Sequence, residues 1–435
     1  MKTPIIDFIE DYKSEKPLRL HTPGHKGFAF FGHEADDITE IPGADELFSP
    51  TGIIAQSEDN ASGLFGAPTY YSTEGSSLCV RAMMYMICRR LGRPAVILAQ
   101  RNAHRSFITA AALTGADVVW MAPHEDDTVL SVTVTAGDVE EQIKKVKPDA
   151  VYLTTPEYLG KITDVSPISE VCRRYGVYLL VDCAHGAYLH FLPKPADPVT
   201  LGADLCCTSA HKTLPALTGA AYLHAPGFSP DEARSAMAAF ASTSPSYLIL
   251  QSLDGLNAYL TGYRRRLLRF LHRVSGLKDA LAAEGFTLYG DEPLKLTIIT
   301  SASGITGADT AKFLRRRGIE AEYFDRDFIT FMLTPEIGAD GCRLLLAALR
   351  DLPRGEALPR TEDRFVLPER VMSIRDAFMA KKTTLPTKEC IGRVAGDVCV
   401  SYPPAVSPVV CGERLDGKTV SYLIENGVGF CQVIT

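Results

Sequence analysis

The sequence predicts an α/β protein: a large domain with a mostly parallel sheet and helices on both sheet faces, plus a smaller α+β C-terminal domain. From about Ala95 to Ala225, short apolar runs alternate with segments whose apolar spacing suits helices, which is typical of a covered parallel sheet. Beyond residue 284 strand-like and helix-like segments alternate again over a shorter stretch. With 435 residues, 46% of them hydrophobic and 22% charged, the chain can bury a large core.

The elements are predicted as follows. The runs expected as strands are AVILAQ, ADVVWMA, DAVYLTT, VYLLVD, DLCCTS and AAYLHA, and the helical segments between them include AGDVEEQIKKV and SPISEVCRRYG. Before them, the segment from Ser72 to Gly92 predicts a turn at Gly75 and then a helix that ends before Gly92. After them, one long helical region is expected from Ser252 to about Glu284.

Four regions follow from this order. We expect an N-terminal arm (1–60), a large domain (61–251), a long helix with a small α+β domain (252–352), and a C-terminal domain (365–435). Residues 353–364 have the proline and charge content of a linker. The last region is predicted to carry one more helix and a proline-rich strand-and-turn piece, VSYPPAVSPVVCGE.

Net charge, hydropathy and cysteine content argue against several classes of protein. The net charge of −7 argues against nucleic acid as the main partner, and the basic run at 263–273 keeps leucines and a phenylalanine at the spacing of an amphipathic helix. No run reaches the length of a membrane span, and the N-terminus lacks the apolar stretch of a signal peptide. Eleven cysteines without a CxxC pair indicate free thiols in a reducing compartment, hence a cytoplasmic protein without a metal site.

Polar side chains follow four of the predicted strands. They are His104, Glu157 with Tyr158, Asp182 with His185, and His211 with Lys212. In parallel sheets, ligands bind beyond the carboxyl ends of the strands. A lone histidine is usually a loop residue with ordinary partners, but the coincidence across four strand ends predicts a site at this edge.

Lys212 is the most informative of these residues. It lies in TSAHKTLPALTG directly after an apolar strand, where a lysine costs several kcal/mol unless its charge is removed or matched. Upstream, Gly75, Ser76 and Ser77 precede a helix, whose free N–H groups could bind a phosphate. The alternative for that segment is an ordinary helix cap.

Together these groups fit pyridoxal phosphate. Lys212 would bind the aldehyde of the cofactor, and Asp182 would hold the proton on its pyridine nitrogen. The groups expected near the phosphate are Gly75, Ser76, Ser77, Ser209 and His211; His104 would lie on the ring face, and His185 would orient the ring or its hydroxyl. Asp182 could instead cap a turn, Ser209 could satisfy backbone groups, and Tyr158 could stack on a ligand or lie in the interior.

The chain resembles the bacterial ornithine/lysine/arginine decarboxylases in their short form, which are pyridoxal-phosphate enzymes of fold type I. The motifs that carry the resemblance are LHTPGHKG, DITEIPGADEL, RNAHRS, VDCAHGAYLHF and SAHKTLPALTG, with the C-terminal YPPAVSPVVCGE. The resemblance implies the same roles for Lys212, Asp182, His104, Ser209 and His211. It also implies decarboxylation of a basic amino acid in polyamine biosynthesis.

The resemblance further implies a homodimer or larger assembly with active sites at the subunit boundary. The N-terminal arm would lie near the neighbouring site, so that His21, His25 and Lys26 would be close to cofactor or substrate. Two other functions remain open: a pyridoxal-phosphate-dependent aminotransferase or lyase, and a catalytically silent homologue that binds the cofactor.

The sequence departs from the family pattern at a few positions. Glu157 stands where a small polar residue is frequent, Cys183 where an acidic residue is common, and Ala405 and Cys411 where glycine and proline are usual. Recognition of a distal cation needs a carboxylate. The candidate carboxylates are therefore Glu157, Glu322, Asp325 and Glu413, and His25 is a further candidate substrate residue because the resemblance implies that the arm lies near the site. Lysine, ornithine and arginine are not separated by sequence spacing.

Overall fold

The computed structural model describes residues 1–359, 365–400 and 405–435. By their internal contacts these residues form two compact units. The first consists of Met1–Arg90 and Leu180–Arg266, and the second of Leu91–Leu179 and Leu267–Thr435. The residues predicted around the lysine and the phosphate all lie in the first unit.

The strands of the first unit are hydrogen-bonded in the order β1-β7-β6-β5. Their bounds are Thr69–Ser72 (β1), Tyr178–Asp182 (β5, whose first residues belong to the second unit), Leu205–Thr208 (β6) and Ala221–His224 (β7). β5 and β6 run parallel, whereas β7 is antiparallel to both β6 and β1. Every residue of β1, β6 and β7 is buried, so these strands form the core of the unit.

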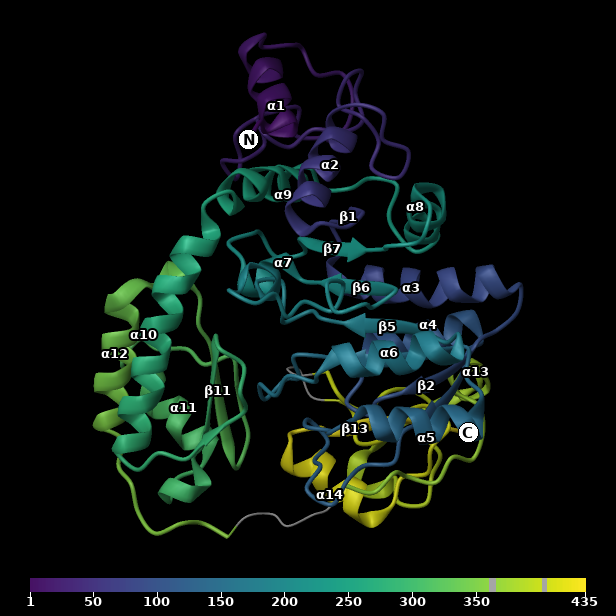
Figure 1. The fold of residues 1–435 in the computed structure, drawn as a ribbon, viewed down its shortest axis with the longest axis vertical. Helices are drawn as coiled ribbons and strands as arrows, with labels where there is room; N and C mark the ends of the chain where they lie inside the picture. Colours follow the sequence, from purple (N-terminus) through teal and green to yellow (C-terminus); the bar gives the residue numbers. More distant parts are fainter. Residues whose placement is uncertain (360–364, 401–404) are drawn as a thin grey trace. The chain divides into compact units, whose positions relative to one another are not determined.

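One helix of the first unit, α3, begins at Gly75, in the segment predicted to bind the phosphate. They are α1 (Pro4–Ser14), α2 (Ile53–Phe65), α3 (Gly75–Leu91, its last residue in the second unit), α7 (Ala210–Thr213), α8 (Pro230–Ala238) and α9 (Tyr247–Leu260), with the short 3-10 turn η1 (Leu189–Phe191). α1, α2 and α9 pack on one another (Figure 1). Asp254 of α9 accepts the backbone N–H groups of Ile5 and Ile6 at 3.0 and 3.1 Å, and it thereby caps the start of α1.

The second unit contains three parallel strands in the order β3-β2-β4. They are β2 (Val96–Ala99), β3 (Asp117–Trp120) and β4 (Ala150–Thr154), and the helices between or after them are α4 (Arg105–Thr114), α5 (Ala136–Val146) and α6 (Val165–Tyr175). α5 begins with a capping box in which Thr135 and Asp138 satisfy each other's backbone N–H groups.

The small domain predicted after residue 284 is an antiparallel sheet in the order β10-β11-β9-β8. The strands are β8 (Leu288–Tyr289), β9 (Lys295–Ile299), β10 (Tyr323–Phe324) and β11 (Phe328–Met332), and the helices are α10 (Tyr263–Ala283), α11 (Gly307–Arg315) and α12 (Gly338–Arg350), with 3-10 turns η2 (Ser301–Ser303) and η3 (Pro335–Ile337). Figure 1 shows the helices beside β11. The predicted α/β class, with mostly parallel strands and a small antiparallel sheet domain, is confirmed.

The long helical region expected at 252–284 is instead two helices. α9 ends at Leu260 and α10 begins at Tyr263, because Thr261 and Gly262 interrupt the helix. The basic run does form an amphipathic helix: its buried side chains follow helical spacing, at Tyr263, Leu267, Phe270, Val274, Leu277 and Leu281.

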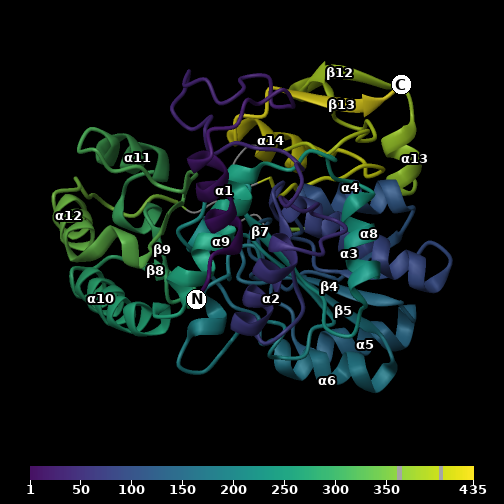
Figure 2. The same ribbon diagram turned by 90° about the horizontal axis from the view of Figure 1, so that it is seen from above.

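The C-terminal region holds more structure than the one helix and the proline-rich strand-and-turn piece that were expected. It contains α13 (Ile374–Met379), β12 (Lys382–Pro386), the 3-10 turn η4 (Thr387–Glu389), α14 (Gly417–Glu425) and β13 (Phe430–Ile434). β12 and β13 pair antiparallel along their whole length, and Figure 2 shows them above α14. Residues 360–364 of the predicted linker and 401–404 of the proline-rich piece lie outside the described residues.

All eleven cysteines are described, and each is buried and free of a disulfide bond. In the described part of the chain, no helix has both the length and the apolar character needed to cross a bilayer.

Candidate active site

Lys212 lies in the short helix α7, just beyond the end of β6. Its Nζ atom is 3.1 Å from Nε2 of His185, a buried side chain in the loop after β5. An ammonium group has no acceptor and an imidazole nitrogen can be either donor or acceptor. The contact therefore lets a proton pass between the lysine and the histidine.

Asp182 is the last residue of β5, and its side chain is only 3% exposed. Its Oδ1 atom accepts the backbone N–H of Ala184 at 3.1 Å. The same oxygen accepts the S–H of Cys207 at 3.5 Å. A buried carboxylate needs such donors, because an unpaired one would be costly.

The start of α3 is joined to the segment before Lys212. Ser209 Oγ donates to Ser76 Oγ at 2.9 Å, and Ser72 Oγ donates to the carbonyl of Gly75 at 2.9 Å. Gly75 has φ +71°, a left-handed conformation that glycine adopts at little cost. Two linked hydroxyls thus lie at a helix start, whose first N–H groups have no partner within the helix.

Gly219 closes the loop that follows α7. Its carbonyl accepts the N–H of Gly75 at 2.8 Å, its φ is +99°, and a Cβ added there would lie 2.9 Å from the carbonyl oxygen of Thr73. The last residue of the motif SAHKTLPALTG is therefore a glycine for a steric reason. It fixes the lysine-bearing loop to the helix start.

His211 is held by the backbone of the same loop. Its Nδ1 atom lies 2.9 Å from the carbonyl oxygen of Ala220. Because a carbonyl only accepts, Nδ1 carries the proton. This bond sets the orientation of the ring beside Lys212 in the chain.

These residues fit pyridoxal phosphate by the chemistry of their donor set. An amine beside a proton acceptor suits the aldehyde, a buried carboxylate suits the pyridinium nitrogen, and hydroxyls at a helix start suit the phosphate. Asp182, His185, Ser209 and Lys212 come from adjoining segments of one unit, and Ser76 is hydrogen-bonded to them through Ser209.

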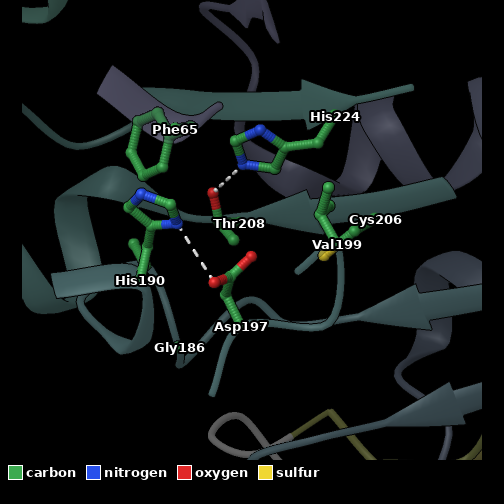
Figure 3. Close-up of a pocket in the computed structure, with 9 residues that line it drawn as sticks. Phe65, Gly186, His190, Asp197, Val199, Cys206, Thr208 and His224 are labelled. Atoms are coloured by element: carbon green, nitrogen blue, oxygen red, sulfur yellow. Dashed lines mark hydrogen bonds and ion pairs between the residues drawn. The ribbon is translucent and has the colours of Figure 1, made fainter. Parts of the chain in front are cut away.

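The opposite face of β6 carries a small cavity instead of a substrate pocket (Figure 3). Successive side chains of a strand point to opposite faces. Thus Cys206 and Thr208 line this cavity, whereas Cys207 points toward Asp182. The cavity volume is about 10 Å³, which is room for one water molecule at most.

Two histidines that line this cavity are held by side-chain hydrogen bonds. His190 Nδ1 is 3.1 Å from Asp197 Oδ2. His224 lies between Thr69 and Thr208, at 2.9 and 3.0 Å from their hydroxyl oxygens, and burial lowers its pKa to about 4. Thr69 donates its own proton to the carbonyl of Ala67, so His224 carries a proton on Nδ1 and accepts from Thr208 on Nε2. These histidines are structural, because each is neutral or paired within the core.

His104, the predicted ring-facing residue, lies in the second unit at the N-cap of α4. Its Nδ1 atom accepts the backbone N–H of Ser106 at 3.1 Å and lies 2.8 Å from Ser106 Oγ. The next residue, Arg105, donates its backbone N–H to the carbonyl of Ala405 at 2.9 Å. The role of His104 toward the cofactor stays a prediction.

Glu157, a candidate for the substrate cation, is buried in the second unit. Its Oε2 atom accepts the N–H of Val132 at 3.1 Å, and Oε1 has no hydrogen-bond partner among the described residues. Burial raises its pKa to about 7, in spite of the opposing charges of Lys161 and Lys295. The neighbouring Tyr158 donates its hydroxyl to Glu322 at 2.9 Å.

The carboxylates of Asp325 and Glu413 are engaged within the second unit. Asp325 accepts the hydroxyl of Tyr323 and the N–H groups of Asp327 and Phe328 at 2.7–2.8 Å. Glu413 Oε2 accepts from Arg101 at 2.8 Å and from the N–H of Val410 at 2.7 Å, and both side chains of the ion pair are buried.

In the N-terminal arm, His25 Nδ1 accepts the N–H of Gly27 at 3.0 Å, so its proton is on Nε2, 3.3 Å from Asp37 Oδ2. His21 Nε2 is 2.9 Å from the hydroxyl of Tyr12, and Lys26 donates to the carbonyl of His21.

Cys207, Gly219 and Arg101 were missed from the sequence. Arg101 stands in the quoted motif RNAHRS, and its position directly after an apolar run is the sequence signal that could have pointed to its buried ion pair with Glu413. Cys207 offers no such signal, because a cysteine in a strand is usually an interior residue.

Known proteins similar to this chain were found by sequence and by structure. A family model described as "Orn/Lys/Arg decarboxylase, major domain" matches residues 3–286. The arginine decarboxylase of Bacillus subtilis is 30% identical, with 98% of this chain and 94% of that protein aligned. The arginine decarboxylase of Halalkalibacterium halodurans is also 30% identical, over 98% of this chain and 93% of that protein.

The solved structure of the constitutive lysine decarboxylase of Escherichia coli superposes with a TM-score of 0.80 at 20% identity, covering 100% of this chain and 82% of that chain. This likeness confirms the predicted fold type, and with the sequence matches it confirms the predicted enzyme class and its pyridoxal-phosphate cofactor. On the match that spans residues 3–286, the chain belongs to the Orn/Lys/Arg decarboxylase family.

Proposed function

We propose that this protein catalyses the pyridoxal-phosphate-dependent decarboxylation of a basic amino acid, with L-arginine as the substrate, and releases CO2 and the corresponding amine. The observation that carries the proposal is the cluster of Lys212, His185, Asp182 and Ser209 with Ser76. The arginine assignment is supported by the two 30%-identical relatives that are named arginine decarboxylase.

The bound cofactor supplies an electron sink for the electron pair left at the substrate α-carbon when the carboxylate departs. Lys212 supplies the amine that attaches the cofactor. His185, 3.1 Å away, takes the proton that this amine must lose to become a nucleophile. Asp182 keeps the proton on the pyridine nitrogen, and its buried position strengthens that charge interaction.

In this proposal the phosphate is bound by Ser76, Ser77 and the N–H groups of α3 that follow Gly75, whose own N–H donates to the carbonyl of Gly219. Ser209 and His211, in the segment that carries Lys212, also lie near the phosphate. The Ser209–Ser76 hydrogen bond at 2.9 Å supports it, because the phosphate segment and the lysine segment then move as one piece. A fixed distance between phosphate and lysine orients the cofactor ring. We assign His104 to the ring face on the family resemblance alone.

Among the candidate carboxylates, we propose Glu322 as the one that binds the distal cation. It is exposed, whereas Glu157 and Glu413 are buried and Asp325 caps a turn. Glu322→Gln is expected to raise KM for arginine about tenfold or more with a smaller change in kcat, since a charged hydrogen bond to substrate is lost. Glu320→Gln, an exposed neighbour paired with Arg315, is the matched control.

We also propose a homodimer in which the N-terminal arm, with His25, lies near the neighbouring site. The arm exposes Leu18, Leu20, Phe28, Phe30 and Phe31 at 74% to 88% of their surface in the single chain. Such a set of exposed apolar side chains is typical of an interaction surface. Light scattering of the protein against Phe30→Ser tests this: the variant is expected to shift toward monomer.

A cytoplasmic location and a product that enters polyamine synthesis complete the proposal. Eleven buried cysteines without a disulfide are typical of a reducing compartment.

The deciding experiment incubates the purified holoenzyme with arginine, lysine, ornithine and an unrelated amino acid, and measures CO2, amine and keto acid. CO2 and amine from arginine at the highest kcat/KM are expected. Keto-acid formation would favour an aminotransferase, and no turnover of any amino acid by cofactor-loaded protein would favour a silent homologue.

A further inference from the structure

Asp182 and Cys207 are partners in the parallel pairing of β5 and β6. The register pairs Leu180 with Leu205, Val181 with Cys206 and Asp182 with Cys207. Paired residues of neighbouring strands direct their side chains to the same face of the sheet. Cys207 therefore reaches Asp182, and its sulfur lies 3.5 Å from Oδ1.

The thiol of Cys207 can only act as a donor in this position. Burial, with the adjacent charge of Asp182 and the thiol of Cys79, raises the pKa of Cys207 well above its usual value. Burial and Asp182 also raise the pKa of the Cys79 thiol, to about 12. Both groups keep their protons at neutral pH, so neither adds a competing negative charge beside the carboxylate.

Two donors meet at one oxygen of the carboxylate. Oδ1 accepts from Ala184 N–H and from Cys207 S–H, whereas neither of these bonds uses Oδ2. A donor on one oxygen fixes the rotation of the carboxylate plane. A thiol is a weak donor, so it orients the group while leaving most of its negative charge for a second partner.

We propose that Cys207 is a positioning residue that holds the carboxylate of Asp182 toward the pyridine nitrogen of the cofactor. This inference rests on the proposed function, because it needs Asp182 to face that nitrogen. Cys207 acts through Asp182 and does not touch the substrate. A hydroxyl in its place would orient Asp182 as well but would draw more charge from it.

The neighbouring Cys206 provides a matched control. It is buried in the same strand but points to the opposite face, where it lines the small cavity, and its sulfur donates to the carbonyl of Cys207. Cys206→Ala removes the same volume as Cys207→Ala without touching Asp182. A merely structural role of Cys207 predicts that both variants behave alike.

The test measures dissociation constants of the apoenzyme for pyridoxal phosphate and for its carbocyclic analogue, in which the pyridine nitrogen is replaced by C–H. Cys207→Ala is expected to weaken binding of pyridoxal phosphate about 3- to 10-fold, because one hydrogen bond to a charged group is lost, and to leave binding of the analogue unchanged. Cys207→Ser is expected to restore part of the affinity for pyridoxal phosphate, because the hydroxyl orients Asp182 but draws more charge from it. Cys206→Ala is expected to change both ligands to the same extent.

A second measurement covers the case in which Cys207→Ala does not fold. In the Cys207→Ser holoenzyme, the pH midpoint of the cofactor absorption band is expected to move upward relative to the wild-type band. The stronger hydroxyl donor weakens the hold of Asp182 on the pyridine proton, so the ring withdraws fewer electrons. An unmoved midpoint overturns the inference.

The two ligands also separate this inference from the proposed function. Wild-type protein that binds pyridoxal phosphate and the analogue equally would contradict the role of Asp182 itself. A wild-type preference for pyridoxal phosphate that persists unchanged in Cys207→Ala would overturn only the role of Cys207.

Discussion

Asp182 shows how the sheet around a single side chain determines its burial and orientation. The strand ends at this residue, burial removes water from the carboxylate, and Ala184 and Cys207 orient it. A carboxylate in this environment interacts strongly with a cation placed beside it. The same carboxylate would be costly to bury if no donor or cation replaced the water that it loses.

Asp182→Asn tests this residue directly. The amide keeps the volume but cannot hold a proton on the pyridine nitrogen, so kcat is expected to fall about a thousandfold while the cofactor still binds, more weakly. Turnover is measured alongside cofactor absorbance, with the exposed Asp231→Asn of α8 as control. Near-normal turnover in Asp182→Asn would remove the electron-sink assignment.

Glu157 provides a prediction on stability against pH. Burial raises its folded-state pKa to about 7 from 4.5, so the folded state binds the proton more tightly than the unfolded state. Stability is therefore lost as pH rises from 4.5 through 7, by about 3 kcal/mol in all. Lys161 and Lys295 are the charged groups that face this carboxylate.

Glu157→Gln removes this titration. The variant is expected to lose less stability than the wild type between pH 5 and pH 8, as measured by urea unfolding, whereas the exposed Glu170→Gln of α6 follows the wild type. Parallel curves for Glu157→Gln and the wild type would contradict the assignment.

The prediction of Lys212, Asp182 and His185 as site residues has a physical reason, and their roles toward the cofactor stay predictions. Lys212, Asp182 and His185 follow apolar strands directly, and polar groups at such places need partners. Cys207 and Gly219 were not predictable, because their roles depend on strand register and on a 2.9 Å approach to Thr73 that spacing in the chain does not reveal. The places of His25 and His104 relative to the cofactor remain predictions.

At the scale of elements, the loop between α7 and β7 is joined to α3 through Gly219 and Gly75. The positive φ of Gly219 and its contact with Thr73 leave no space for a side chain. This junction keeps the lysine segment at a constant distance from the helix start. The rigidity of this junction depends on both the loop and helix α3.

Gly219→Ala is expected to destabilise the protein by about 1 to 3 kcal/mol, the cost of a strained backbone, and to weaken cofactor binding because the loop must shift. Gly63→Ala in α2 is the control: nothing lies within 4 Å of its added Cβ, and alanine favours a helix by up to about 1 kcal/mol. Thermal unfolding and cofactor titration measure both effects. A Gly219→Ala variant as stable as the wild type would contradict the steric argument.

The six apolar runs expected as strands are all strands, because a buried strand leaves a continuous apolar run in the sequence. The pair β12–β13 was missed because neither strand is a continuous buried run: no residue of β12 is fully buried, and β13 alternates exposed and buried residues. β1 was missed because its four residues, TYYS, are buried but half of them are small and polar. The break between α9 and α10 occurs at one glycine in an otherwise helical pattern, where sequence signals are weak.

At the scale of the whole molecule, family and fold follow from motifs spread along nearly the full chain, and the comparisons confirm them. The four predicted domain ranges remain predictions, since the contacts divide the chain into two units instead. In the proposed function one distal carboxylate, Glu322, binds the cation of the substrate, and basic side chains that differ by a methylene are separated by only about 1 to 3 kcal/mol in a pocket.

The covalent attachment of the cofactor to Lys212 is the central claim, and borohydride reduction followed by peptide mapping tests it most directly. Reduction of the holoenzyme is expected to leave the pyridoxyl group on the peptide that contains Lys212. The label should disappear in Lys212→Ala and persist in Lys194→Ala, an exposed lysine of the same unit. A label on another lysine, or none on cofactor-loaded protein, would contradict the account.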